Sequence, residues 1–137
     1  MAGAGIITKW VTWGPKMKAI LRIVAAFVFM LSGTVKLFSF PVAMPDGMEL
    51  NLFSQIGLGG VLEVFGGALI LIGWFTRPVA FILAGEMAVA YFQFHFPKGF
   101  WPNVNGGTPA VLYCFLWLYY SAAGAGPWSI DSWRGKK

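Results

Sequence analysis

Apolar residues along the chain gather into four runs, separated by short segments rich in glycine, proline and polar residues. The runs cover residues 17–40, 56–75, 78–96 and 108–125. Each is close to the ~20 residues that an α-helix needs to cross an ~30 Å hydrocarbon core. The pattern predicts an all-α membrane protein, a compact four-transmembrane-helix bundle.

The segments outside these runs divide the rest of the chain. Residues 1–17 mix Trp10 and Trp13 with lysines, a composition typical of the headgroup layer, and we predict an N-terminal interfacial segment there. A disordered tail is the alternative, since chain termini are often loose. Residues 18–126 form the predicted four-helix domain, and residues 127–137 form a polar tail.

The first apolar run and the segment that follows it each allow two interpretations. A basic flank before an apolar core is also typical of a signal peptide, but no small-residue cleavage site follows and further spans do. We therefore predict a retained helix. Residues 40–55 contain Pro41 and Pro45 among many apolar residues, so this segment is either a loop or an interfacial helix.

Composition and charge support a lipid environment. The chain is 58% hydrophobic and 11% charged, whereas a soluble domain carries about 25% charged residues. The net charge of +5 comes from residues at the termini and at the ends of the apolar runs, which does not indicate nucleic-acid binding. With four spans, the side that holds both termini receives Lys9, Lys16, Lys18, Arg22, Arg77, Arg134, Lys136 and Lys137. The positive-inside rule then predicts that both termini face the cytoplasm. The localisation that we expect is a bacterial inner membrane.

Ionisable residues inside the runs are the candidates for chemistry, because each costs about 2.5–3.5 kcal/mol at the bilayer centre. Glu63 and Glu86 fall near mid-membrane. Lys36 could reach toward Glu63, and Arg22 toward Glu86. His95 lies nine residues after Glu86, so a regular helix places the two on opposite faces and excludes one site unless the helix is kinked. A cluster of Lys36, Glu63 and His95 is geometrically possible.

These charges have two interpretations. They form structural ion pairs that fix helix register, or they shape a polar pocket that binds a quinone-like ligand or lipid, or that relays protons. The supporting residues of such a pocket would be Arg22, Arg77, Gln93, Tyr113 and Trp117. Tyr113 and Trp117, with Tyr120, form a helical aromatic stripe that indicates either a packing face or a surface for stacking a ring.

Metal and redox chemistry have little support in the sequence. A single histidine with scattered carboxylates is a weak metal signal, and we predict no metal site. Cys114 is the one cysteine and cannot form a dithiol pair within the chain. The sequence has no nucleotide-binding fingerprint, so we predict no intrinsic cofactor, and a redox group would have to come from a partner.

The residues together resemble the DoxX family of small membrane proteins over residues 18–133. The resemblance is carried by Arg22, Gly33-x-x-Lys36, Glu63 before Gly66-Gly67, the Thr76-Arg77 turn, Glu86, His95, and Gly126-Pro127-Trp128-Ser129-x-Asp131. Members similar to this chain often have Gly-Glu where it has Gly107-Thr108. If that acid belongs to the polar site, Thr108 would weaken proton or cation handling.

The resemblance implies a four-helix bundle and a choice of functions, because fold alone does not define activity. The family includes subunits of thiosulfate:quinone oxidoreductase and partners of redox-defence enzymes, which implies a cofactor-free, non-haem subunit of a quinone-linked redox or oxidative-defence system. The alternatives are a non-catalytic assembly or scaffold protein that docks a partner enzyme, and a small-molecule or ion transporter. Whether the chain is an enzyme stays open. The expected partners are the lipid bilayer and either another protein or further copies of the chain.

Overall fold

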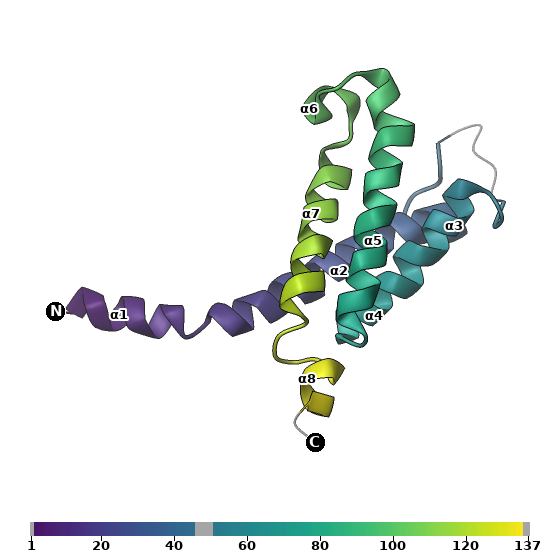
Figure 1. Cartoon of the computed structure of the whole chain (residues 1–137). Coiled ribbons are helices and arrows are strands. Elements are labelled where there is room, and N and C mark those ends of the chain that lie inside the picture. The colour runs from purple at the N-terminus through teal and green to yellow at the C-terminus, as the bar shows by residue number, and fades with distance from the viewer. Residues whose placement is uncertain (1, 46–50, 136–137) are drawn as a thin grey trace.

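The computed structural model describes residues 2–45 and 51–135, and within these ranges every regular element is a helix (Figure 1). The elements are α1 (Ala2–Val11), α2 (Gly14–Phe38), α3 (Gln55–Val61), the π-helix η1 (Leu62–Gly66), α4 (Gly67–Ile72), α5 (Thr76–Ala90), the π-helix η2 (Tyr91–His95), the 3₁₀ helix η3 (Phe96–Lys98), α6 (Pro102–Asn105), α7 (Thr108–Ala123) and α8 (Ile130–Gly135).

Three continuous helical rods of the described residues are long and apolar enough to cross a membrane. They are Gly14–Phe38, Gln55–Ile72 and Thr76–Lys98, and they fall on the first three predicted runs. The predicted membrane character and helical class are therefore confirmed. Helix α7 has 16 residues, or about 24 Å at ~1.5 Å per residue, and lies on the fourth run.

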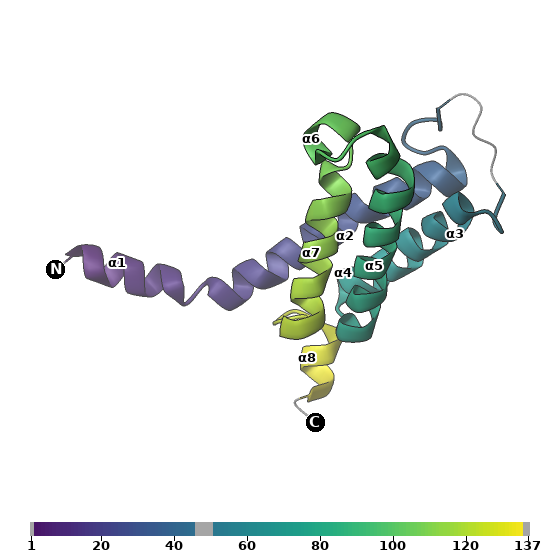
Figure 2. The same cartoon turned by 45° about the horizontal axis from the view of Figure 1, so that its top comes forward.

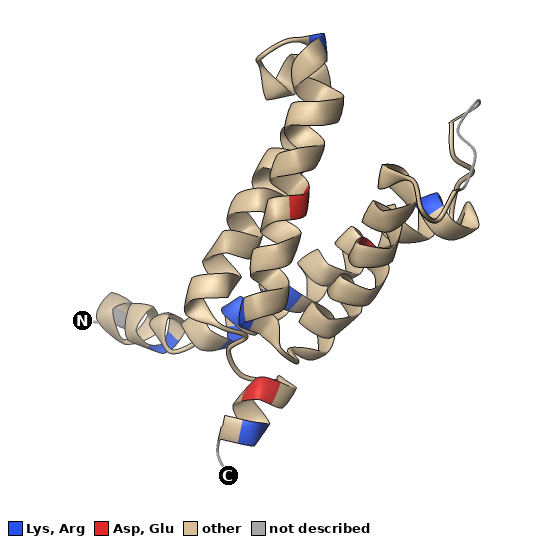
Figure 3. Ribbon diagram, turned by 45° about the vertical axis from the view of Figure 1, so that its right-hand side comes forward, with Lys and Arg blue, Asp and Glu red and all other residues tan. Residues whose placement is uncertain are grey.

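The helices pack as two pairs. In the first helix pair α2 packs against the rod α3–η1–α4, and in the second α5 packs against α7. The pairs come together near the α4–α5 turn and diverge toward α6 and the start of α3 (Figures 1 and 3). Phe29 of α2 and Trp117 of α7 are fully buried where the pairs meet, with ring centroids 5.3 Å apart and an edge-to-face arrangement.

Glycine lets the two members of the first helix pair approach closely. A Cβ atom added to Gly33 would lie 2.8 Å from the Gly60 carbonyl oxygen and 2.7 Å from a methyl group of Val64. Such contacts between small residues drive helix association in lipid, where the hydrophobic effect between helices is absent. This is the role that the glycine-rich second run predicts.

Two cations of α2, Lys18 and Arg22, hold the C-terminal end of α7 and the segment that follows it. The Arg22 side chain is fully buried, and its guanidinium donates to the carbonyl oxygens of Ala125 and, at 2.7 Å, Trp128. Lys18 Nζ donates to the Ala123 oxygen at 2.7 Å. The predicted approach of Arg22 to Glu86 is therefore wrong. Its guanidinium instead donates to backbone carbonyls of the segment that joins α7 to α8, and buried carbonyls need such partners.

The segment after α7 folds back onto the bundle. The Asp131 carboxylate accepts hydrogen bonds from the backbone N–H groups of Phe75 (3.0 Å) and Thr76 (2.9 Å), at the start of α5. Its own N–H donates to the Gly73 oxygen at 2.9 Å. A carboxylate at this position satisfies amides that the first turn of a helix leaves free. The residues predicted as a polar tail thus cap α5, while residues 136–137 lie outside the described range.

The N-terminal residues form helix α1, which projects away from the bundle (Figures 1 and 2). The chain bends at Thr12 and Trp13, and Gly14 and Pro15 form the first turn of α2, where proline is well tolerated.

The sequence leaves residues 40–55 as either a loop or an interfacial helix. In the structure, residues 40–45 and 51–53 are non-helical. Residues 46–50 lie outside the described residues. Ser54 then caps α3 by accepting a hydrogen bond from the Gly57 N–H at 3.1 Å.

Candidate functional site

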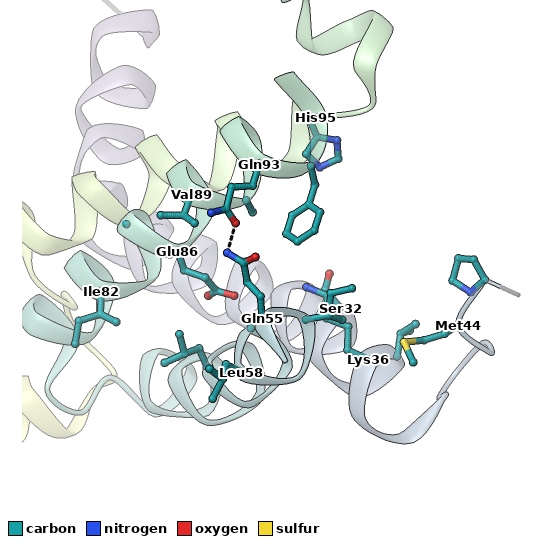
Figure 4. A pocket seen from close by; sticks show the side chains of 18 of the residues that line it. Ser32, Lys36, Met44, Gln55, Leu58, Ile82, Glu86, Val89, Gln93 and His95 are labelled. Carbon is teal, nitrogen blue, oxygen red and sulfur yellow. Dashed lines mark hydrogen bonds between the residues drawn. The ribbon is translucent and has the colours of Figure 1, made fainter. Parts of the chain in front are cut away.

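A cavity of about 1110 Å³ lies where the two helix pairs diverge (Figure 4). Its walls are largely apolar and come from α2, the rod α3–η1–α4 and the rod α5–η2–η3. The apolar walls include Val35, Ile56, Leu58, Leu62, Ile82 and Val89. The polar groups are few and are contributed by Ser32, Lys36, Gln55, Glu86, Gln93, His95 and Lys98. Ligand sites in proteins have this composition, with apolar walls and a small number of placed polar groups.

An ion pair joins the first helix pair at the edge of this cavity. Lys36 Nζ donates to Glu63 Oε1 at 2.6 Å, which confirms the predicted approach of the two residues. The Glu63 side chain is 2% exposed and the Lys36 side chain 32% exposed, so the lysine borders the cavity while the glutamate lies behind it. Glu63 belongs to η1, and π-helical turns inside α-helices are frequent at functional sites.

Glu86 of α5 faces this ion pair from the second helix pair. A Cβ atom on Gly59 would lie 3.2 Å from Glu86 Oε1 and 3.9 Å from Lys36 Nζ, so both charged groups converge over that glycine. The Glu86 carboxyl interacts electrostatically with Lys36 and Glu63. The Oε2 atoms of Glu63 and Glu86 are both buried without a hydrogen-bond partner among the described residues. Lys36, Glu63 and Glu86 therefore form one charge cluster at the wall of the cavity.

Two glutamines bridge the cavity farther along. Gln55 of α3 donates from its amide nitrogen to the Gln93 amide oxygen on η2, and the two side chains meet between the helix pairs (Figure 4). The sequence analysis named Gln93 but missed Gln55. The signal for Gln55 was its position four residues before Gly59, on the same helix face.

His95 lines the same cavity as Glu86. The prediction that the two residues face opposite sides is wrong, because η2 lies between them and a π-helical turn takes up about one residue more than an α-helical turn. His95 Nδ1 lies 3.2 Å from the Asn105 carbonyl oxygen. Among the described residues, Lys36 and Glu63 bond to each other and no hydrogen bond joins His95 to either of them, so the three-residue cluster that the sequence leaves possible is not joined by hydrogen bonds.

The aromatic stripe of α7 lies in the core. Phe29 contacts Tyr113 and Trp117 with ring centroids at 5.0 and 5.3 Å, and neither α7 residue borders the cavity. The interpretation as a packing face therefore holds. Arg22 and Arg77 are also remote from the cavity, because Arg77 donates to the Ala122 carbonyl at the end of α7.

Asn105 was not anticipated and organises the loop between α5 and α7. Its side chain donates to the Gly99 oxygen at 2.7 Å and accepts from the Gly107 N–H at 2.8 Å. Tyr91 turns toward the same loop and donates to the Phe100 oxygen. Thr108 follows at the exposed start of α7 and does not border the cavity. The missing family-typical acid therefore falls outside this site.

Fold and site together define a small helical membrane protein with a ligand-sized cavity between its helices. The chain belongs to the DoxX family, whose sequence profile, described as DoxX, matches residues 17–96. This range includes Lys36, Glu63, Glu86 and His95. A relative from Haemophilus influenzae (strain ATCC 51907 / DSM 11121 / KW20 / Rd) bears the name "Uncharacterized protein"; it is 44% identical over 126 residues, covering 90% of this chain and 94% of the relative. No solved structure matches the chain significantly.

Proposed function

We propose that α7 is a fourth membrane span and that both termini face the cytoplasm of a bacterial inner membrane. Helix α7 lies beside α5 (Figures 1 and 2), and at 16 residues it approaches the ~17 residues of the shortest spans. Lys18, Arg22 and Arg77 gather at its C-terminal end. A cluster of basic residues on one side marks the cytoplasmic face.

We further propose that the cavity binds a quinone-like ring carried by an apolar tail, and that the chain is a membrane subunit of a quinone-linked redox or oxidative-defence system. The observation that supports this proposal is the 1110 Å³ cavity with apolar walls and few polar groups. Ligand pockets commonly have volumes of about 300–1,000 Å³, so a ring and the first part of a tail fit together. A redox cofactor would be supplied by a partner protein.

The polar groups suit the carbonyl oxygens of such a ring. The Gln55–Gln93 amide pair crosses the cavity close to Glu86 (Figure 4), and Lys36 also lines it. Amide N–H groups and an ammonium group donate hydrogen bonds, and quinone carbonyls accept them. The apolar walls between these polar groups would contact the faces of the ring.

Titration of the purified protein in detergent with a short-chain ubiquinone tests this function. Gln93→Leu removes one amide while keeping the size of the side chain, and we expect binding about threefold to tenfold weaker, the loss of one hydrogen bond. Phe115→Leu changes an exposed residue of α7 outside the cavity and is the control. Equal affinities for the parent chain and Gln93→Leu would contradict this use of the cavity.

A second candidate function is that of a non-catalytic assembly protein. Helix α1 favours it, because Ile6, Ile7, Trp10 and Val11 are all more than 60% exposed on a helix that projects from the bundle. Such a helix binds either the bilayer surface or a partner protein. Removal of residues 2–11 would abolish stoichiometric co-purification of a partner if α1 docks it. Full retention of that partner would assign α1 to the lipid surface.

A further inference from the structure

The charge cluster of Lys36, Glu63 and Glu86 contains one cation and two acids. Lys36 Nζ lies 2.6 Å from Glu63 Oε1 and is the group that balances Glu63. The Glu86 carboxyl reaches the same point over Gly59, and among the described residues no cation other than Lys36 is placed against it. Inside a membrane an uncompensated charge is costly, and groups that lack a counter-charge become neutral instead.

The other ionisable groups near Glu86 do not supply this balance. Helices α4 and α7, which pack against α5 or its neighbours, carry no charged residue. His95 borders the cavity but its Nδ1 is directed to the Asn105 oxygen. Lys98 lies twelve residues beyond Glu86 on the same rod, a rise of about 18 Å. Glu63 and Lys36 are thus the groups that set the charge of Glu86.

We propose that Glu63 and Glu86 hold one exchangeable proton between them, and that Glu86 presents this proton to the cavity. The cluster is then neutral, with a Lys36 ammonium, a Glu63 carboxylate and a Glu86 carboxylic acid. Both Oε2 atoms are buried and unpartnered among the described residues, and Glu63 is 98% buried as its side chain is 2% exposed. Two adjacent carboxyl groups that share a proton titrate as a pair.

The proton determines the chemistry of the ligand that fits. A carboxylic acid donates a hydrogen bond, whereas a carboxylate only accepts. Glu86 therefore favours a ligand oxygen that accepts, such as the carbonyl of an oxidised quinone. This part of the inference rests on the proposed function, and the proton itself does not.

Infrared spectroscopy of the ligand-free protein in lipid tests the proton directly. At neutral pH the parent chain should show one protonated-carboxyl C=O band that shifts in D₂O. Glu86→Gln and Glu63→Gln should each lose this band, because Lys36 balances the single acid that remains. Lys36→Met should about double the band, because both acids then become neutral. Asp131→Asn alters a carboxylate on the backbone at the other end of α5 and should leave the band unchanged.

Absence of the band in the parent chain, or its persistence in both glutamine variants, would overturn the shared proton. Variants of Glu86 also distinguish the shared proton from the proposed quinone binding. Glu86→Gln retains a donor and should bind short-chain ubiquinone within about threefold of the parent, whereas Glu86→Met should bind about tenfold more weakly. If the band behaves as stated but no quinone binds, the proposed function fails and the proton stands. If quinone binds and the band is missing, the proton fails alone.

Discussion

Lys36 and Glu63 share a 2.6 Å hydrogen bond across the helices of the first pair, with the acid buried in a π-helical turn and the base at the edge of the cavity. The bond connects packing to the site, because it fixes the register of the two helices and leaves Glu86 as the carboxyl that borders the cavity. A buried pair of this kind costs desolvation when it forms, and removal of one partner alone is more damaging than replacement of both.

A double-mutant cycle at this pair should show strong coupling. We expect Lys36→Met and Glu63→Leu each to lower the free energy of unfolding by about 1–3 kcal/mol, because each leaves a polar group without its partner. The double variant should lose less than the sum by at least about 1 kcal/mol. Reversible unfolding in mixed micelles measures these free energies. Strictly additive losses would mean that the pair contributes nothing to the fold.

At the level of elements, close packing of α2 on α3 and η1 depends on a glycine. Gly33→Ala places a Cβ atom 2.8 Å from the Gly60 backbone oxygen, and we expect a loss of about 1–3 kcal/mol from overpacking. Gly85→Ala is the matched control, because a Cβ atom on this mid-helix glycine of α5 meets nothing within 4 Å. It should leave stability unchanged or raise it by up to about 1 kcal/mol. Thermal unfolding of both variants measures these changes in stability. Equal changes for Gly33→Ala and Gly85→Ala would contradict the close approach of the helices at Gly33.

The cap on α5 gives a second prediction for an element. Asp131→Ala removes the acceptor of the Phe75 and Thr76 N–H groups, and we expect a loss of about 0.5–2 kcal/mol, as for other helix caps. Asp131→Asn keeps one acceptor oxygen and should lose less. Hydrogen exchange at the first turn of α5 should rise in the alanine variant. Unchanged exchange there would show that the segment after α7 does not cap the helix.

The helical rods were predictable because length and apolar composition alone govern which segments cross a membrane. The approach of Lys36 to Glu63 was predictable for a similar reason, since each had few other partners. The placement of His95 beside the Glu86 cavity was not, because regular periodicity carries no signal for the π-helical turn in η2. The contacts of Arg22 and Asp131 were not predictable either, because both side chains bind backbone groups, and the sequence does not indicate which backbone groups lie nearby.

At the scale of the whole molecule, the number of spans has a direct test. Cys114→Ala removes the one cysteine of the chain, and Val104→Cys and Gly135→Cys then place single thiols in α6 and at the end of α8. With α7 as a span, these positions lie on opposite sides of the membrane. A membrane-impermeant maleimide should label Val104→Cys in spheroplasts and Gly135→Cys only after the membrane is broken. Labelling of both in intact spheroplasts would exclude the four-span arrangement.

The arrangement of the two helix pairs explains how a small bundle holds a large cavity. The pairs are fastened at one end by Arg22, Lys18 and Asp131 and diverge at the other (Figure 3). The divergent end is bridged by the Gln55–Gln93 hydrogen bond, and its largely apolar walls carry a few further polar groups, among them Lys36 and Glu86. These polar groups face the cavity, and we propose that an amphipathic molecule from the bilayer enters it.

Photo-cross-linking with a quinone analogue that carries a diazirine on its ring tests this account most directly. The label should be displaced by unmodified short-chain ubiquinone and should map to the cavity walls, on peptides that contain Lys36, Leu58 or Gln93. Gly85→Phe, which extends a wall of the cavity where a Cβ atom meets open space, should reduce the displaceable label. Displaceable label on the exposed face of α7 around Phe115, or label that ubiquinone does not displace, would contradict a quinone site between the helix pairs.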